Sequence, residues 1–233
     1  MAPSSPSATS SPIPKVWIRS RNSRSMSEED KPTDWFESLY RDASDEGEGV
    51  PWTNMATHPS FAAWLETNSL QGSEKEALVV GCGMGDDAIE LESWGYQVTA
   101  FDVAESAIDH CKRRFPDSTV DFQTADLFDE NKQWRHRFDF VLEIYTIQAL
   151  LPKYAETLIP KIADFVAPGG RLLVVTVTGD KPRSFEDGPP WILTPDHVTE
   201  FESLGLEIVD RMVREAASKA NNDVWVTTFE RPA

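Results

Sequence analysis

Cysteine and histidine are scarce in this sequence of 233 residues. It contains two cysteines, Cys82 and Cys111, and four histidines. Two cysteines cannot build the disulfide framework of a small secreted domain, and the scattered histidines lack the spacing of zinc ligands. No apolar run reaches the roughly 20 residues that a transmembrane helix needs. We therefore expect a soluble protein of a reducing compartment, with no metal site and no membrane partner.

Positive charge is also scarce. The chain has 22 Lys and Arg against 39 Asp and Glu, which gives a net charge of −17. Phosphate recognition requires clustered Lys and Arg, so a nucleic-acid partner is disfavoured. With 40% hydrophobic and 26% charged residues, a chain of this length can bury the full core of one domain. We expect a monomer or a homodimer.

The first 27 residues differ in composition from the rest. They are rich in serine and proline and contain four basic residues but no acidic one. Because such a segment has too little apolar surface to fold, residues 1–33 are predicted to be a disordered tail. Serine- and arginine-rich N-termini are also typical of organellar transit peptides, and Met26 could equally be the true start. We expect a cytoplasmic protein, or an organellar one if residues 1–27 are a transit peptide.

Strands and helices alternate along the remainder of the chain. Expected strands cover residues 77–80, 97–101, 119–123, 138–144, 171–177, 206–212 and 224–230. The alternation predicts a parallel sheet, and the short link before the last strand makes the final pair antiparallel. The expected fold is α/β: a doubly wound, Rossmann-like, seven-stranded, mostly parallel sheet with an antiparallel C-terminal strand pair. Residues 34–233 form the domain, with 34–74 as a helical N-terminal cap and 75–233 as the core.

A glycine loop follows the first core strand. Gly81, Gly83 and Gly85 lie between that strand and its helix, where ligands of such sheets bind and where glycine lets backbone N–H groups approach them. Asp102 ends the next strand, 21 residues after Gly81. A carboxylate at that point can accept hydrogen bonds from both hydroxyls of a ribose. Together the two features predict a ligand that contains a nucleoside.

The residues after the loop help to identify the nucleoside. A dinucleotide fingerprint requires a third glycine at position 86, which is Asp86. A carboxylate at the N-terminus of the helix would repel a pyrophosphate. Asp86 and Asp87 better suit a ligand with a cationic sulfonium and an amino group. An NAD-dependent oxidoreductase is therefore disfavoured.

Further short motifs follow in order: Ala125-Asp126-Leu127, Phe138-Asp139 and Ala167–Leu173. With Val79–Gly85 and Asp102, they resemble the class I S-adenosylmethionine-dependent methyltransferases over residues 75–230. The resemblance implies S-adenosyl-L-methionine as the cofactor and methyl transfer as the activity.

The resemblance also implies roles for individual residues. The three glycines would shape the loop beneath the methionine, Asp102 would hold the ribose, and Asp126 would meet the adenine amino group. Val103 and Leu127 would flank the adenine, and Glu143 would lie beside the methionine. The full set of implied cofactor-binding residues is Trp35, Trp52, Gly81, Cys82, Gly83, Gly85, Asp87, Asp102, Val103, Asp126, Leu127 and Glu143.

A narrower resemblance concerns the cap. Trp35, Tyr40 and Pro51-Trp52, followed by a Gly-Cys-Gly-x-Gly-x-Asp loop that ends at Asp87, are similar to the thiopurine, thiol/halide and tellurite-resistance methyltransferase group. In that group the cap covers the cofactor, and its aromatic residues line the pocket of the small substrate. Residues 53–59 depart from the group's pattern, because they lack the Asp and Gly that tend to follow Pro-Trp.

Methyl transfer from a sulfonium is an in-line displacement that requires positioning and exclusion of water. A thiolate or another soft nucleophile needs no strong general base. The segment Glu143–Thr146 contains no Asn-Pro-Pro-Tyr motif, which argues against methylation of exocyclic amines. We expect methyl transfer to a small-molecule acceptor, such as a thiol or another soft nucleophile. The alternative is a non-catalytic S-adenosylmethionine- or nucleoside-binding regulatory protein.

Tyr145 is the candidate catalytic residue, because it follows a strand at the ligand-binding edge. The alternative for Tyr145 is a half-buried packing role. A loop over residues 179–193 follows the fifth strand at the same edge, and its aromatic residues are expected to close over the substrate. His58 and His197 could act as bases, but each lies at the start of a helix and is interpreted as a surface residue. Candidate substrate-binding residues are Tyr40, Trp52, Tyr145, Phe185 and Trp191.

Overall fold

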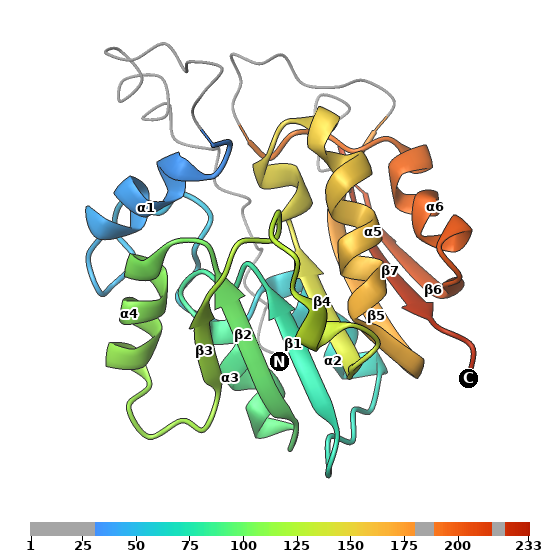
Figure 1. The fold of residues 1–233 in the computed structure, drawn as a ribbon, viewed down its shortest axis with the longest axis horizontal. Helices are drawn as coiled ribbons and strands as arrows, with labels where there is room; N and C mark the ends of the chain where they lie inside the picture. Colours follow the sequence, from blue (N-terminus) through green and yellow to red (C-terminus); the bar gives the residue numbers. More distant parts are fainter. Residues whose placement is uncertain (1–30, 180–188, 216–221) are drawn as a thin grey trace, which may run out of the picture. The chain divides into compact units, whose positions relative to one another are not determined.

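The computed structural model describes residues 31–179, 189–215 and 222–233 (Figure 1). In these segments seven strands form one sheet: β1 (Glu76–Val80), β2 (Gln97–Asp102), β3 (Asp121–Thr124), β4 (Phe138–Ile144), β5 (Val166–Thr178), β6 (Glu207–Arg214) and β7 (Asp223–Glu230). Their order is β3-β2-β1-β4-β5-β7-β6. Strands β1 to β5 pair in parallel, and β7 lies between β5 and β6, antiparallel to both. The predicted sheet is confirmed.

Helices cover both faces of the sheet. They are α1 (Asp34–Arg41), α2 (Pro59–Thr67), α3 (Asp86–Ser93), α4 (Glu105–Arg114), α5 (Ala155–Phe165) and α6 (Pro195–Ser203). Side chains of α5 and α6 belong to one apolar cluster and side chains of α2 and α3 to a second, on opposite faces (Figure 1). None of the described helices is both long and apolar enough to cross a membrane.

The register of the parallel strands gathers the predicted site at one edge. Val80, the last residue of β1, pairs with Phe101 of β2 on one side and with Glu143 of β4 on the other. All three strands therefore end at the same level, as parallel strands with buried, apolar sequences do. The glycine loop, Asp102 and Tyr145 follow directly from these ends.

Strand β5 begins earlier than the expected 171–177. The structure extends it back to Val166, and the register with β4 shifts between Phe138 and Phe140. The irregularity takes up Pro168, Gly169 and Gly170, and Gly169 has a φ of 74°. Proline and glycine are typical of turns, so periodicity alone placed the strand's start after them. Bulges of this kind accommodate such residues within a sheet.

The cap is fastened to the N-terminal half of α4. Glu37 of α1 accepts hydrogen bonds from the Ser106 backbone N–H at 3.1 Å and from the Ser106 hydroxyl at 2.6 Å. The His110 ring lies 3.0 Å from the Tyr40 carbonyl oxygen and 2.7 Å from the Asp45 carboxylate. The Ser106 N–H belongs to the first turn of α4 and has no partner within the helix, so Glu37 satisfies it. These contacts fix α1 above the ligand-binding edge.

Candidate active site

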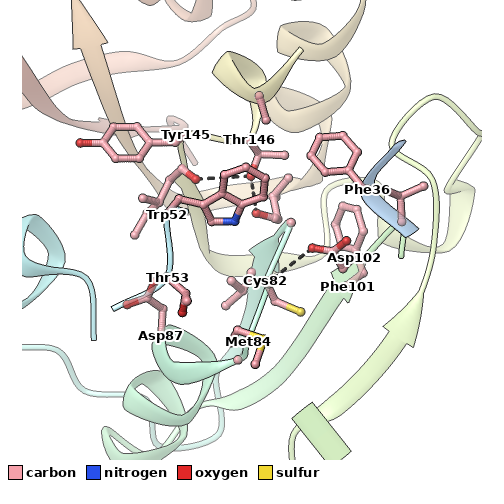
Figure 2. Close-up of a pocket in the computed structure, with 18 of the residues that line it drawn as sticks. Phe36, Trp52, Thr53, Cys82, Met84, Asp87, Phe101, Asp102, Tyr145 and Thr146 are labelled. Atoms are coloured by element: carbon pink, nitrogen blue, oxygen red, sulfur yellow. Dashed lines mark hydrogen bonds between the residues drawn. The ribbon is translucent and has the colours of Figure 1, made fainter. Parts of the chain in front are cut away.

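A pocket opens at the carboxyl ends of β1, β2 and β4, and the cap forms its opposite wall (Figure 2). Four carboxylates line it, from Asp86, Asp87, Asp102 and Asp126, and none of the described lining residues is Lys or Arg. The predicted residues that the pocket brings together are Tyr40, Trp52, Gly81, Cys82, Gly83, Gly85, Asp87, Asp102, Val103, Asp126, Leu127 and Tyr145.

The glycine loop is shaped by its protein neighbours. Gly81 has a φ of 62°, and a Cβ there would lie 2.5 Å from the Thr146 hydroxyl oxygen. Gly83 has a φ of 53°, and its Cβ would lie 3.0 Å from the Tyr40 hydroxyl oxygen. A side chain at either position would thus be strained and would displace β4's turn or the cap. These neighbours add a second reason for glycine to the expected one, which is free approach of the loop's N–H groups to a ligand.

Asp102 is buried at the end of β2 and oriented by the backbone. Its Oδ2 accepts a hydrogen bond from the Gly83 N–H and its Oδ1 from the Ala104 N–H, both at 3.0 Å (Figure 2). Burial raises its pKa to about 6, against the effect of these backbone donors. Asp102 is therefore largely ionised at neutral pH. Because a carboxylate has about four acceptor positions, two remain for the hydroxyls of a ribose.

The two carboxylates at the start of α3 differ in their partners. Asp86 forms a two-pronged ion pair with Arg114, with both N···O distances at 2.8 Å. The expected repulsion of a pyrophosphate by Asp86 needs correction, because Arg114 compensates its charge. Asp87 instead accepts a hydrogen bond from the His58 backbone N–H at 2.7 Å. Desolvation raises the pKa of Asp87 to about 7.

Asp126 lies at another part of the pocket wall. Its Oδ1 accepts a hydrogen bond from the Phe128 N–H at 2.8 Å, and the Thr33 hydroxyl donates to its Oδ2 at 3.5 Å. Val103 and Leu127 line the same pocket. Of the tail expected over residues 1–33, residues 1–30 lie outside the described residues. Thr33, in contrast, is buried and lines the pocket.

Aromatic residues of the cap close the pocket. The Trp52 indole N–H donates a hydrogen bond to the Tyr40 hydroxyl at 3.0 Å, yet 36% of Trp52 stays exposed. Tyr40 is buried, and this desolvation raises its pKa well above the usual value, so the phenol remains neutral. Trp35 packs edge-on against Trp52 at 5.9 Å and is absent from the described pocket lining. Trp35 thus supports Trp52, and Trp52 faces the ligand space.

Comparisons with known proteins agree with this geometry. Residues 77–170 match a family model described as "Methyltransferase domain". The chain is 27% identical over 182 residues to "Probable thiol methyltransferase 2" of Arabidopsis thaliana, covering 74% of this chain and 75% of that protein. The family match over residues 77–170 and this relative support the assignment of the chain as a class I S-adenosylmethionine-dependent methyltransferase.

Solved structures share the fold. The Burkholderia thailandensis 1,6-didemethyltoxoflavin-N1-methyltransferase, with S-adenosylhomocysteine bound, has a TM-score of 0.66 at 20% identity, covering 90% of this chain and 94% of that one. A structure concerned with conversion of a disulfide bond into a thioacetal group during echinomycin biosynthesis has a TM-score of 0.66 at 22% identity, covering 86% and 93%. The family match and the S-adenosylhomocysteine bound in the Burkholderia enzyme support S-adenosylmethionine as the cofactor. Its cationic sulfonium suits a lining with four carboxylates and, among the described residues, no Lys or Arg.

The turn after β4 holds Tyr145 in an unusual backbone conformation. Tyr145 has a φ of 59°, a region that costs a non-glycine residue about 1 kcal/mol or more. The Thr146 hydroxyl secures the turn by donating to the Val80 carbonyl oxygen at 2.8 Å. In Figure 2 the Tyr145 hydroxyl points away from Trp52 and Asp102. Desolvation raises the pKa of Tyr145 to about 12, so its phenol is neutral in this methyltransferase.

Glu143 braces the same turn from beneath. Its carboxylate is fully buried, and Oε1 accepts a hydrogen bond from the Ile147 N–H at 3.0 Å. Oε2 has no hydrogen-bond partner among the described residues, and burial raises the pKa of Glu143 to about 7. Glu143 is not among the described residues that line the pocket, although it was expected beside the methionine. In the structure Glu143 instead stabilises the turn that contains Tyr145, through its hydrogen bond with the Ile147 N–H.

The loop after β5 contributes differently from the expectation. Phe185 lies outside the described residues. Trp191 is 4% exposed and is absent from the described lining. Its backbone N–H donates to the Gln148 carbonyl oxygen at 2.8 Å. Pro189 and Pro190 line the pocket in its place.

His58 is a pocket residue of the methyltransferase that the sequence interpretation placed on the surface. It is half-buried, and its ring meets the Tyr145 ring edge-on at 5.2 Å. Its position between the aromatic cap segment and the start of α2 was the available signal. His197, in contrast, forms a capping box with Thr194 at the start of α6.

Proposed function

We propose that this methyltransferase methylates a small-molecule thiol or another soft nucleophile. The observation that carries the proposal is the pair of side chains at this end of the pocket, Tyr145 and His58, whose rings meet edge-on at 5.2 Å. Tyr145 is a neutral phenol, and the pKa of the adjacent His58 lies far below neutrality. Neither is suited to remove a proton from an alcohol or an amine at neutral pH, whereas a thiol that ionises in water needs no such base. The similarity to a probable thiol methyltransferase supports the same acceptor class.

Within this proposal the cofactor is held by residues of the loop and the strand ends. Asp102 accepts hydrogen bonds from the ribose hydroxyls, and Asp126 accepts one from the adenine amino group between Val103 and Leu127. Asp87 faces the cationic amino group of the methionine, which would lower the raised pKa of this carboxyl. When bound, the cofactor supplies an electrophilic methyl group.

The cap and the β4 turn act on the acceptor. Trp52 and Tyr40 exclude water, and Tyr145 and His58 hold the acceptor in line with the methyl group. Positioning and exclusion of water are the main protein contributions to such a displacement. Tyr145 contacts the acceptor through its ring, since its hydroxyl points away from Trp52 and Asp102 (Figure 2).

Three acceptors of nearly equal shape test the proposal. Benzenethiol, phenol and aniline are each incubated with the full chain and S-adenosylmethionine, and formation of S-adenosylhomocysteine is measured. We expect turnover of benzenethiol and at least about tenfold slower turnover of the other two. Faster turnover of phenol or aniline would show that the enzyme supplies a base after all. Tight S-adenosylhomocysteine binding without turnover of any thiol would instead favour a regulatory binding protein.

A further inference from the structure

His58 occupies a junction between the cap, the cofactor loop and the acceptor end of the pocket. It is the N-cap residue of α2, and its Nδ1 accepts a hydrogen bond from the Ser60 backbone N–H at 3.2 Å. Its own backbone N–H donates to Asp87 at 2.7 Å. His58 lines the pocket, and its ring packs edge-on against Tyr145. Backbone and ring are thus both held in place at the pocket wall.

The hydrogen bond to Ser60 determines which ring nitrogen carries the proton. The Ser60 N–H can donate only to an atom with a free lone pair, so Nδ1 of His58 must be unprotonated. The neutral ring must then carry its proton on Nε2. No described residue accepts a hydrogen bond from Nε2, and that atom is not among the buried atoms without a partner. The Nε2–H donor is therefore accessible.

Burial and a neighbouring positive charge keep the His58 ring neutral. Desolvation and the positive charge of Arg214 lower the pKa of His58 to about 4. The Arg214 guanidinium donates to the Ser60 hydroxyl at 3.2 Å, next to the His58 cap. The other ionisable groups that face this region are Asp87 from α3, which accepts the His58 backbone N–H, and Tyr145 from the β4 turn, with Glu143 near it.

We propose that His58 is a specificity-determining residue of the acceptor site, where its Nε2–H donates a hydrogen bond to the nucleophile and does not take the nucleophile's proton. The inference rests on the proposed function. The acceptor thiol loses its proton to water, the thiolate forms the new S–C bond, and the S–C bond of the sulfonium breaks. An N–H donor stabilises an anionic sulfur and offers nothing to a protonated amine. The site thereby selects acceptors that ionise by themselves.

Two substitutions separate this role from the capping role. His58→Asn keeps a side-chain acceptor for the Ser60 N–H, because Asn is a preferred N-cap residue, but its amide does not reach the position of Nε2. His58→Gln restores a donor near that position. We expect His58→Asn to retain the melting temperature and the S-adenosylhomocysteine affinity and to lose about three- to tenfold in kcat/KM for benzenethiol. His58→Gln should recover part of this loss. An unchanged kcat/KM in His58→Asn would overturn the proposal.

The pH profile distinguishes a donor from a base. With benzenethiol and 2-mercaptoethanol as acceptors, the rising limb of kcat/KM should follow each thiol's own pKa and should persist in His58→Asn. A limb at one common pKa for both thiols that vanishes in His58→Asn would identify His58 as a general base and overturn the proposal.

A spectroscopic measurement is independent of turnover. Nitrogen-15 NMR of the full chain should show His58 as the neutral Nε2–H tautomer from pH 8 to pH 5. Added benzenethiol, with S-adenosylhomocysteine present, should shift the Nε2–H resonance. Titration of His58 near 6.5, an Nδ1–H tautomer or an unmoved resonance would overturn the inference. If no thiol is turned over but the tautomer and the shift are found, the proposed reaction fails and the donor role stands.

Discussion

Replacement of Asp102 by Asn tests the cofactor site most directly, because the two side chains have the same shape. In the native protein both Asp102 oxygens accept backbone hydrogen bonds, from Gly83 and from Ala104. An amide has one oxygen and one NH₂ group, so in either orientation one backbone N–H faces another donor. Asp102→Asn therefore removes a charge, one backbone hydrogen bond and one charged acceptor for the ribose.

Two opposing terms determine the stability of Asp102→Asn. Burial raises the pKa of Asp102 from 3.8 to about 6, so above pH 6 the ionised carboxylate costs the folded state about 3 kcal/mol. The pKa of Asp102 is higher in the folded than in the unfolded state. The folded protein is therefore more stable by this amount below pH 4, where Asp102 is protonated, and it loses this stability as the pH rises to 6. The substitution removes the cost, but the unsatisfied N–H costs about 1–3 kcal/mol. We expect stability equal to the native protein or up to about 2 kcal/mol higher at pH 7.5.

Binding of the cofactor product should fall in the same variant. A hydrogen bond to a charged group contributes about 1.5–3 kcal/mol, so the S-adenosylhomocysteine affinity should drop about 10- to 100-fold. Calorimetric titration measures the affinity, and urea unfolding at pH 4.5 and 7.5 measures the stability. The stability of the variant relative to the native protein should rise by about 2 kcal/mol between these pH values. An affinity within threefold of native refutes the ribose contact, and equal destabilisation at both pH values refutes the desolvation argument.

Three further substitutions test the pocket walls. Trp52→Ala should weaken S-adenosylhomocysteine binding about tenfold, as measured by calorimetry. The same substitution should change the unfolding free energy by less than about 1 kcal/mol, because Trp52 is partly exposed. Trp52→Phe, which keeps an aromatic ring, is the control. Tyr145→Phe should keep kcat, since the neutral hydroxyl points away from Trp52 and Asp102, whereas Tyr145→Ala should lower kcat/KM for the acceptor; a large loss in Tyr145→Phe would contradict this. Thr146→Val should cost about 1–2 kcal/mol in urea unfolding, since the Val80 carbonyl loses its donor, and no loss would show that the turn holds without it.

Most of the fold follows from the sequence pattern, because strand periodicity and helix caps are local. Helices α1 and α2 lie within the predicted helical cap 34–74, and the sheet has the predicted seven strands. The start of β5 differs because a bulge absorbs Pro168, Gly169 and Gly170. Helix α5 begins at residue 155, after a short 3₁₀ turn at 152–154, and continues through Pro160. Tertiary packing of a buried apolar face outweighs proline's local cost there.

Site residues that directly follow strand ends could be predicted from the sequence. Whether a given side chain points into the pocket could not be predicted. Asp102 and the glycine loop depend only on the parallel register. Glu143 precedes the β4 turn, and its side chain bonds within that turn. Trp191 likewise packs inward against Gln148. His58 enters the pocket because α2 begins beside α3, a contact between segments whose placement no local pattern specifies.

The preference against a dinucleotide rests on a different ground from the one that the sequence supplied. Asp86 at the start of α3 is paired with Arg114 and contributes little net charge. Across the described lining, however, the pocket has Asp87, Asp102 and Asp126 without any Lys or Arg to offset a phosphate. Two phosphates would meet these carboxylates with no Lys or Arg of the described lining to offset their charge, whereas a sulfonium and an ammonium group would be stabilised by the carboxylates. The preference for a cationic cofactor is therefore a property of the whole pocket, and no single carboxylate carries it.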